Sequence, residues 1–266
     1  MTQYSAPSKR RLGWLVLPLL LIAALGAWYL LDPGFGRSRQ AILAGANLPQ
    51  DEFGRKVRDY LVANPEVIVE AMDVLDQRRK AAEQTEAQAA LAASREELFN
   101  SNESPVGGNP QGDVTLVEFF DYNCPYCRQV APLMVDAEAN DDKLRVVYKE
   151  FPILGPNSIF AAKAALAVQR QGKYPEFHKA MMQVQGQSDE ASVIAVATEL
   201  GLDIAKLRQD MEDAAIAAEI DRNLALARAL RINGTPGFVI GEEIARGAID
   251  LATMKSLIEQ ARWSKK

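Results

Sequence analysis

Two cysteines stand two residues apart in the run Cys124-Pro125-Tyr126-Cys127, and the 266-residue chain contains no others. The preceding segment, Val114 to Phe120, is rich in β-branched and aromatic residues, which is typical of a buried strand. The following segment, Gln129 to Ala139, has the pattern of a helix. The pair therefore lies where a buried strand passes into a helix, and this placement constrains the fold more than any other feature of the sequence.

This placement predicts thiol chemistry. The N-terminus of a helix carries unpaired backbone N–H groups and the positive end of the helix dipole, and both favour a thiolate over a thiol. The thiolate is the species that attacks a disulfide. We expect Cys124 to be the exposed nucleophile, and Cys127, one turn into the helix, to resolve the mixed disulfide.

Other uses of the two thiols are weaker. A structural zinc ion takes four ligands, and His178 is the only histidine in the chain, so the supply of ligands is poor. A static disulfide between residues this close constrains the unfolded chain little and therefore stabilises little. Two thiolates could also hold Cu(I). We expect no resident metal ion and no cofactor, and the sequence contains no glycine-rich phosphate loop.

The run Phe120-Asp121-Tyr122-Asn123-Cys124-Pro125-Tyr126-Cys127, with Thr235-Pro236 far downstream, resembles the DsbA-type thioredoxin-fold family. The resemblance extends from about Val114 to the C-terminus. Within the family the chain resembles the ScsC-like (suppressor of copper sensitivity) and Com1-like proteins, which carry an N-terminal oligomerisation segment and include trimeric disulfide isomerases. The resemblance implies an α/β thioredoxin fold with a helical insertion. The chain before this fold is expected to form an N-terminal transmembrane helix, for the reasons given below, and a helical stalk.

The resemblance also assigns a substrate groove. It implies a cis bond before Pro236 that faces the cysteines, although an X–Pro bond in general favours trans. The backbone of Thr235 would then pair with an extended substrate strand. Pro125 and Tyr126, between the two cysteines, complete the expected substrate-binding set.

Two residues are candidates for proton transfer. Glu118, six residues before Cys124, can be an ordinary strand residue that reaches solvent. The resemblance implies instead a buried acid that accepts a proton as the buried cysteine ionises, a role that suits a carboxyl with a raised pKa. We expect Lys149, in the next strand, to be its partner, because an unpaired buried charge is costly.

The direction of electron flow is predicted from two positions. Thr235 before the proline resembles the disulfide isomerases, and Tyr126 replaces the histidine of the strongest oxidants. Both favour a less oxidising protein, so our prediction is a protein disulfide isomerase. The alternatives are a dithiol oxidase that introduces disulfides into secreted proteins, and a chaperone or Cu(I)-binding module that uses the thiols as ligands.

The N-terminus predicts export. Lys9-Arg10-Arg11 precedes an uncharged apolar run, Leu12 to Leu31. A membrane span needs about 20 apolar residues, and a preceding basic cluster predicts a cytoplasmic N-terminus. A cleaved signal peptide is the alternative. We expect the protein on the periplasmic face of the bacterial inner membrane, or free in the periplasm if the segment is cleaved.

We divide the chain into an anchor or signal segment (residues 1–37), a helical oligomerisation stalk with its linker (38–106) and the catalytic domain (107–266). The stalk carries an apolar stripe of Phe53, Val57, Tyr60, Leu61, Ile68, Met72 and Leu75. The stripe either docks on the catalytic domain or mediates self-association through residues 50–100, and the resemblance favours a trimer. Ser101 to Gly112, rich in Gly, Pro and Asn, is the predicted linker.

The rest of the catalytic domain alternates between sheet and helix. A helical block is predicted between two halves of the sheet, and His178 within it is expected to be a packing residue. The predicted elements are strand 144–151, helices 159–171, 174–185 and 191–200, a helix capped by Asp203 that runs to residue 211, helix 214–230, strands 238–240 and 244–249, and helix 251–263 capped by Asp250.

The charge of the chain limits its partners. The net charge is −5 and the isoelectric point is near 5.2, which argues against nucleic-acid binding. We expect disulfide-containing client proteins, a membrane redox partner and further copies of the chain as partners.

Overall fold

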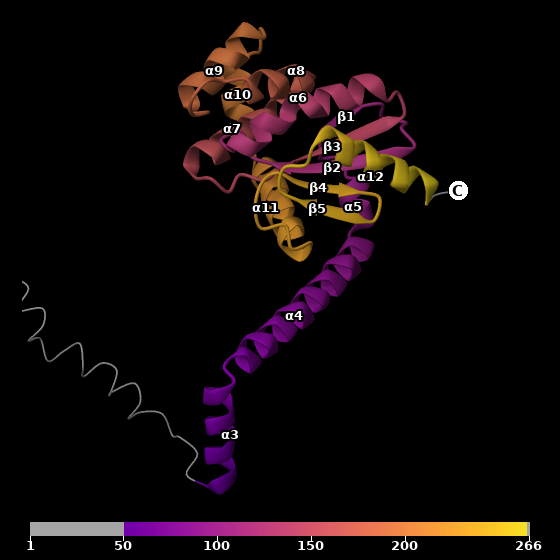
Figure 1. The fold of residues 1–266 in the computed structure, drawn as a ribbon. Helices are drawn as coiled ribbons and strands as arrows, with labels where there is room; N and C mark the ends of the chain where they lie inside the picture. The colour runs from indigo at the N-terminus through magenta and orange to yellow at the C-terminus, as the bar shows by residue number, and fades with distance from the viewer. Residues whose placement is uncertain (1–50, 265–266) are drawn as a thin grey trace, which may run out of the picture. The chain divides into compact units, whose positions relative to one another are not determined.

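The structure is a computed structural model that describes residues 51–264 (Figure 1). The chain divides into two compact units, Met1–Val74 and Leu75–Lys266. The helices and strands, in chain order, are α3 (Glu52–Ala63), α4 (Glu66–Ala93), α5 (Arg95–Phe99), β1 (Val106–Gly108), β2 (Val114–Phe120), α6 (Pro125–Asn140), β3 (Leu144–Glu150), α7 (Pro156–Gln169), α8 (Tyr174–Met182), α9 (Glu190–Glu199), α10 (Ile204–Met211), α11 (Ala214–Ala229), β4 (Gly237–Ile240), β5 (Glu243–Arg246) and α12 (Leu251–Trp263).

The described part of the first unit consists of α3 and the first turns of α4. Asp51 caps α3, because its carboxylate accepts a hydrogen bond from the backbone N–H of Gly54 at 2.6 Å. The predicted apolar stripe is solvent-exposed: Phe53 is 77% exposed and Met72 is 63% exposed. The stripe is therefore an apolar surface of the helices in the single chain.

The predicted membrane anchor is not part of the described structure. Leu12 to Leu31 lies outside the described residues. Within residues 51–264, no helix combines the length and the apolar character that a membrane span requires.

A five-stranded sheet forms the centre of the second unit. Its strand order is β1-β3-β2-β4-β5, with β2 and β3 parallel and the other neighbours antiparallel. Glu118 pairs with Tyr148 across β2 and β3, and Phe119 pairs with Lys149. Because side chains alternate along a strand, Glu118 and Tyr148 face one side of the sheet while Phe119 and Lys149 face the other.

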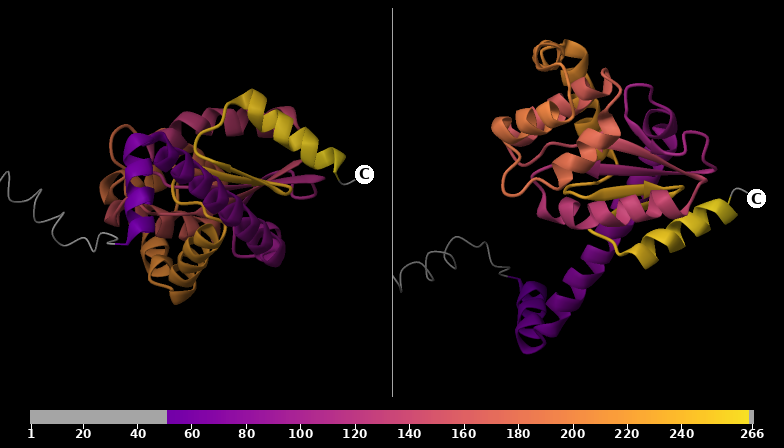
Figure 2. Two further views of the ribbon diagram at one scale, coloured as in Figure 1. Left: turned by 60° about the horizontal axis from the view of Figure 1, so that its bottom comes forward. Right: turned by 90° about the horizontal axis from the view of Figure 1, so that it is seen from above.

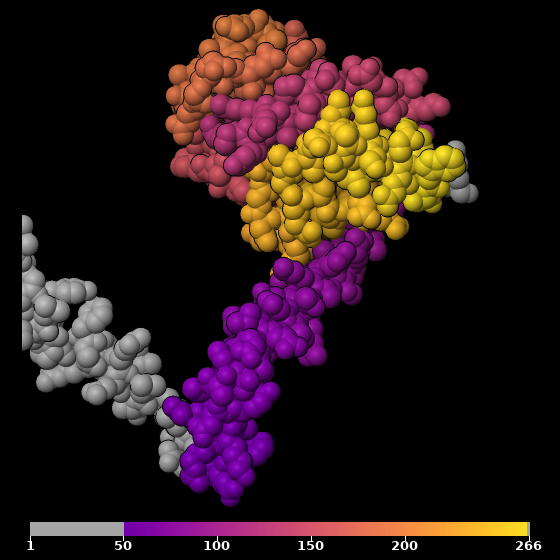
Figure 3. Space-filling model, viewed as in Figure 1, coloured from indigo at the N-terminus to yellow at the C-terminus, as the bar shows by residue number. Residues whose placement is uncertain are grey.

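The Glu118 face of the sheet is covered by helices α6 and α12, and the helical block α7–α10 adjoins it (Figures 1 and 2). Helix α6 contacts β3 and α12 contacts β2, and the two helices form the outer surface over this face (Figure 3). Leu116 and Phe120 of the sheet are buried against Val130 and Met134 of α6. Burial of each such side chain contributes about 1.5–3 kcal/mol to folding.

The Lys149 face is covered by α11, α5 and the end of α4. Leu91 of α4 and Leu98 of α5 are buried there against Val117 and Phe119. These residues belong to the compact unit that begins at Leu75, whereas the sequence predicted a catalytic domain that begins at residue 107. The last turns of the predicted stalk supply part of the core of the second unit.

The predicted linker, Ser101 to Gly112, contains a strand. Strand β1 pairs antiparallel with β3 and forms one edge of the sheet. Two of its three residues are Gly107 and Gly108, and glycine is depleted in strands. The composition therefore indicated a linker where the structure has an edge strand.

The helical block lies between β3 and β4 in the chain, as predicted, and its helix ends differ from the predicted ends by a few residues. The predicted cap of α10 is confirmed, since Asp203 accepts a hydrogen bond from the N–H of Lys206 at 2.9 Å. The cap of α12 is also confirmed, since Asp250 accepts from Thr253 at 2.7 Å. The last strand is shorter than predicted, because Gly247 has a φ of 86° and lies beyond it.

Candidate active site

The two cysteines lie at the N-terminus of α6. Cys124 is the N-cap residue, with φ −81° and ψ 118°, and Pro125 is the first residue of the helix. Proline suits this position because its fixed φ matches the helix and no N–H is needed there. The helix therefore begins four residues earlier than predicted. Both cysteines are free thiols in this structure.

Cys124 is less accessible than predicted. The residue is 4% exposed, so the expectation of an exposed nucleophile is wrong. Its Sγ lies under the segment that precedes Pro236, 3.2 Å from the carbonyl oxygen of Thr235, to which it donates a hydrogen bond when it carries its proton. The adjacent Tyr126 is 61% exposed and marks the solvent side of the site.

The two thiols differ in acidity. A hydrogen bond from the Cys127 thiol, with further hydrogen bonds from the Thr235 side chain and from the backbone N–H groups of Cys127 and Tyr126, lowers the pKa of Cys124 to about 5. The same hydrogen bond to Cys124, together with burial and the charge of Glu118, raises the pKa of Cys127. Cys124 is therefore a thiolate at neutral pH while Cys127 stays protonated.

The Thr235–Pro236 peptide bond is cis, as the resemblance implied. It precedes β4, the strand that pairs with β2. The carbonyl group of Thr235 reaches the Cys124 sulfur, so this turn and the cysteines form one site.

Glu118 is a buried acid. Its side chain is 1% exposed, so it does not reach solvent as an ordinary strand residue on an open face does. Burial, and then the negative charges of Glu138 and Cys124, raise the pKa of Glu118 to about 8. The charge of Glu118 in turn helps to raise the pKa of Cys127. Glu118 is thus electrostatically linked to both thiols.

Lys149 is not the partner of Glu118. Because Lys149 pairs with Phe119 in the sheet register, its side chain lies on the opposite face. There its Nζ donates hydrogen bonds to the Ser104 hydroxyl at 2.7 Å and to the Glu97 carbonyl oxygen at 2.9 Å. The sequence placed the two residues in adjacent strands correctly, but their one-residue offset in register separates them.

Sequence analysis missed two residues on the Glu118 side. Tyr148 lies beside Glu118 on β3 and donates a hydrogen bond from its hydroxyl to Glu138 of α6. Glu138 follows Cys127 by 11 residues, a separation that returns to nearly the same face of a helix. This 11-residue spacing is the feature of the sequence that could have predicted an acidic side chain near the thiols.

The loop before the cysteines is fixed by polar contacts. The carboxylate of Asp121 accepts hydrogen bonds from the backbone N–H groups of Asn123 at 2.8 Å and of Ile153 at 2.9 Å. Arg128 of α6 donates to the carbonyl oxygen of Tyr122 at 2.8 Å. These contacts hold the end of β2 and the start of α6 in one geometry.

His178 packs among aromatic rings, as predicted. Its ring centroid lies 4.8 Å from that of Phe120 and 4.4 Å from that of Tyr148. Burial lowers the pKa of His178 to about 3, so the imidazole is neutral at physiological pH. The described residues contain no cluster of three His, Cys, Asp or Glu side chains that could hold a metal ion.

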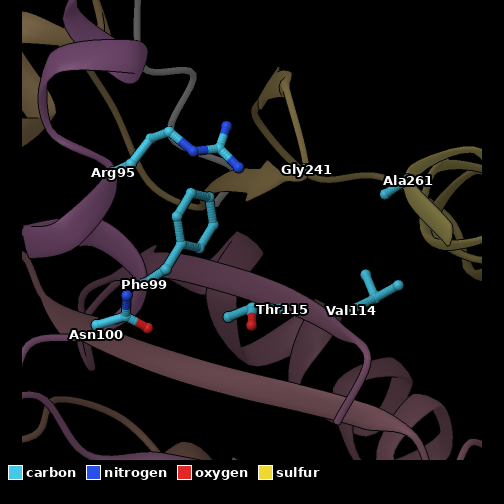
Figure 4. A pocket seen from close by; sticks show the side chains of 7 residues that line it. All are labelled: Arg95, Phe99, Asn100, Val114, Thr115, Gly241 and Ala261. Carbon is cyan, nitrogen blue, oxygen red and sulfur yellow. The ribbon is translucent and has the colours of Figure 1, made fainter. Parts of the chain in front are cut away.

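A separate cavity of about 190 Å³ lies away from the thiols (Figure 4). Val114 and Thr115, at the start of β2, contribute to its lining, whereas Cys124 follows the other end of that strand. Arg95 lies over the ring of Phe99 in this cavity, 5.6 Å from the centroid. The cavity therefore does not contribute to the thiol site.

Curated relatives match part of the chain. The Na(+)/H(+) antiporter NhaA 1 of Salinispora arenicola is 28% identical over 158 residues, which are 59% of this chain and 24% of the antiporter. The antiporter NhaA of Herminiimonas arsenicoxydans is 30% identical over the same length. The chain spans about a quarter of the length of these curated relatives.

The chain is similar to several solved structures over nearly the whole length of each. A thioredoxin-like oxidoreductase from Silicibacter pomeroyi DSS-3 is 46% identical with a TM-score of 0.63, covering 64% of this chain and 98% of that one. Proteus mirabilis ScsC in a transitional conformation is 33% identical with a TM-score of 0.63, covering 80% and 96%. Salmonella enterica Typhimurium BcfH is 27% identical with a TM-score of 0.67, covering 85% and 99%.

Two family models match separate parts of the chain. The DSBA-like thioredoxin domain matches residues 115–259, which include both cysteines, Glu118 and the cis proline. The copper resistance protein ScsC N-terminal domain matches residues 50–82. The matches confirm the predicted thioredoxin fold with its helical insertion, and the chain belongs to the DsbA-like thioredoxin family, among its ScsC-like members.

Proposed function

We propose that the protein is a thiol–disulfide oxidoreductase in which Cys124 is the nucleophile and Cys127 the resolving thiol. The observation that carries this proposal is the Cys124 sulfur itself. It lies at a helix N-terminus beside the Thr235 carbonyl, and its pKa of about 5 leaves it ionised at neutral pH. A thiolate in such a position is the attacking species of disulfide exchange.

The exchange proceeds in two balanced steps. The Cys124 thiolate attacks a client disulfide, so that a Cys124–client disulfide forms and one client thiolate leaves. Glu118 then takes the proton of the Cys127 thiol, and the resulting thiolate attacks the Cys124 sulfur. The Cys124–Cys127 disulfide forms, the second client thiolate leaves, and two electrons have passed to the client. The reverse sequence oxidises a client dithiol.

The client occupies the groove between the cysteines and the cis turn. The backbone of Thr235 pairs with an extended client strand, and Pro236 shapes the groove. Tyr126 supplies an exposed aromatic ring next to Cys124, and Pro125 lies beside it, also exposed.

Isomerisation is the direction that we favour. The exposed stripe of α3 and α4 is an apolar surface that a second and third copy of the chain would cover. Joining several thiol sites in a trimer raises their effective concentration around one misfolded client. Thr235 and Tyr126 favour a less oxidising dithiol, which an isomerase needs because it must stay reduced.

We place this activity outside the cytosol. A related Salmonella enterica protein, 30% identical, is described as a periplasmic thioredoxin-like protein. Together with the apolar run Leu12 to Leu31, this supports a periplasmic location with the run as anchor or cleaved signal. A membrane redox partner would then return the dithiol to its reduced state.

The exchange reaction is tested by trapping. Cys127→Ser should accumulate a mixed disulfide between Cys124 and client proteins, detected by mass spectrometry of non-reduced samples. Cys124→Ser is the matched control and should form none. Equal exchange activity in Cys124→Ser and in the unaltered protein would remove the enzyme proposal.

The direction of the reaction is tested with a scrambled-disulfide substrate. We compare the chain from Ser38 onward with the same chain carrying Met72→Lys, which places a charge on the exposed stripe. Glu70→Lys, on an exposed position of the same helix, is the control for charge. Loss of reactivation and of self-association in Met72→Lys alone supports the oligomeric isomerase. Rapid oxidation of a reduced peptide by all three chains, without reactivation, identifies a dithiol oxidase.

A further inference from the structure

A second carboxylate is fixed beside the Glu118 site by two hydrogen bonds. The hydroxyl of Tyr148 donates to Oε1 of Glu138 at 2.5 Å. The backbone N–H of Gly108 in β1 donates to Oε2 of the same carboxylate at 3.2 Å. Glu138 is half-buried, so its carboxylate is held in place while it still reaches solvent.

The strand register places the carboxylate of Glu138 on the same side of the sheet as Glu118. Tyr148 is the β3 partner of Glu118, and both side chains point to the face that α6 covers. Glu138 lies on α6 and meets this face at its β1 edge. Its negative charge is one cause of the raised pKa of Glu118 and also raises the pKa of Tyr148.

A missing side chain leaves room for this arrangement. A Cβ on Gly107 would lie 2.9 Å from Cε2 of Tyr148, and 3.2 and 3.3 Å from the two carboxylate oxygens of Glu138. The first distance is shorter than side-chain contacts normally allow. The absence of a side chain at Gly107, one of the glycines for which β1 was predicted to be a linker, therefore leaves space for the Tyr148–Glu138 pair.

The other groups around Glu118 supply negative charge or none. Helix α6 contributes Cys124 and Cys127, and β3 contributes the buried Glu150, which accepts hydrogen bonds from Tyr122 and Tyr174. The side chains of β4 and α12 on this face are apolar, among them Phe238, Met254 and Ile258. The charges that act on Glu118 are those of Glu138 and Cys124.

We propose that Glu138, held by Tyr148 and Gly108, is a positioning residue that sets the strength of Glu118 as the base for Cys127. This inference rests on the proposed role of Glu118. The proton moves from the Cys127 sulfur to a carboxylate oxygen of Glu118, and Glu138 takes no part in the transfer. A fixed negative charge nearby makes the protonated form of Glu118 more favourable and therefore makes Glu118 a stronger base.

The test separates the two thiol steps. The reduced protein is mixed with one equivalent of an aromatic disulfide that releases two thionitrobenzoate ions, the first on attack by Cys124 and the second on attack by Cys127. The rate of the second release should rise with pH as Glu118 ionises. Glu138→Gln should shift the midpoint of this rise down by about one pH unit and lower the plateau rate about threefold. The first release should not change.

Further variants keep the test decisive. Glu138→Asp retains the charge and should return the midpoint most of the way to the unaltered value. Tyr148→Phe removes the hydroxyl that holds Glu138 and should shift the midpoint in the same direction as Glu138→Gln, but less. Asp136→Asn, an exposed carboxylate on the same helix, is the control and should leave the midpoint unchanged.

The outcomes distinguish a failure of the role proposed for Glu138 from a failure of the role proposed for Glu118. If Glu118→Gln slows the second release while Glu138→Gln and Tyr148→Phe leave its pH midpoint unchanged, Glu118 remains the base and the role of Glu138 is overturned. The same holds if Glu138→Gln only lowers the melting temperature. If Glu118→Gln itself keeps the rate and the pH profile of the unaltered protein, the proposed proton acceptor is wrong and the inference about Glu138 fails with it.

Discussion

Glu118 and Lys149 are buried ionisable residues on adjacent strands, and they lie on opposite faces of the same sheet. Lys149 has oxygen partners from Ser104 and Glu97, and Ser104 donates in turn to Glu219, which also pairs with Arg222. Glu118 has thiols and a second acid as its charged neighbours. The ammonium of Lys149 therefore has oxygen partners, whereas Glu118 is surrounded by groups that become negatively charged.

This difference indicates that Lys149 stabilises the fold and that Glu118 exchanges protons. A buried ion with its hydrogen bonds satisfied joins the elements around it, and Lys149 joins β3 to α5 and to the segment before β1. A buried carboxyl among other acids holds a proton near neutral pH and can exchange it. We therefore expect the two residues to respond to substitution in opposite ways.

The largest expected effect is a gain in stability from Glu118→Gln at high pH. The pKa of Glu118 is about 8 in the folded protein against an ordinary value of 4.5. The contribution of Glu118 to stability is therefore complete below pH 4.5 and is lost as the pH rises through 8. In urea unfolding of the reduced protein at pH 9, Glu118→Gln should raise the free energy of unfolding by about 5 kcal/mol. At pH 4 the two proteins should be equal, and a gain of similar size there would contradict the raised pKa.

The opposite response is expected for Lys149→Met. Removal of this ammonium leaves Ser104 and the buried Glu219 without one of their polar neighbours, and should lower the free energy of unfolding by about 3 kcal/mol. Urea unfolding at pH 7 measures the loss. Lys143→Met, at an exposed position just before β3, is the control. A loss no greater than that of the control would show that Lys149 does not fix these elements.

A smaller effect is expected at the cis turn. The side chain of Thr235 contributes one of the hydrogen bonds that lower the pKa of Cys124 to about 5. Thr235→Val should raise the pKa of Cys124 by about one unit, which corresponds to about 1.4 kcal/mol. The pH dependence of alkylation of the reduced protein measures this shift, and Thr235→Ser should restore the original midpoint. An unchanged midpoint in Thr235→Val would assign the thiolate to the helix N-terminus and Cys127 alone.

The sequence predicted the thiol site because its signals are local. The cysteine spacing, the strand before it and the cap residues Asp203 and Asp250 each act over a few residues. The face of the sheet on which a side chain lies depends on contacts between distant segments. For this reason the sequence prediction paired Lys149 with Glu118, although the two lie on opposite faces. The register that separates it from Glu118 is set by contacts between β2 and β3 that no short segment encodes.

The same limit applies to β1 and Glu138. A three-residue strand with two glycines carries no strand signal of its own and exists because β3 offers it a partner. Glu138 gains its place from that strand and from Tyr148. The burial of Cys124 likewise depends on Thr235, more than a hundred residues away in the chain.

The most direct test of the comparison is the rate at which Cys127 resolves a mixed disulfide on Cys124, measured at pH 9, where Glu118 is ionised, in Glu118→Gln and in Lys149→Met. We expect Glu118→Gln to slow this step at least about 100-fold, because general-base catalysis contributes on the order of 10²–10⁴. Lys149→Met should match the unaltered protein at a temperature where it is folded. Equal rates in Glu118→Gln and the unaltered protein, or slowing in Lys149→Met alone, would contradict the assignment of chemistry to one face of the sheet and structure to the other.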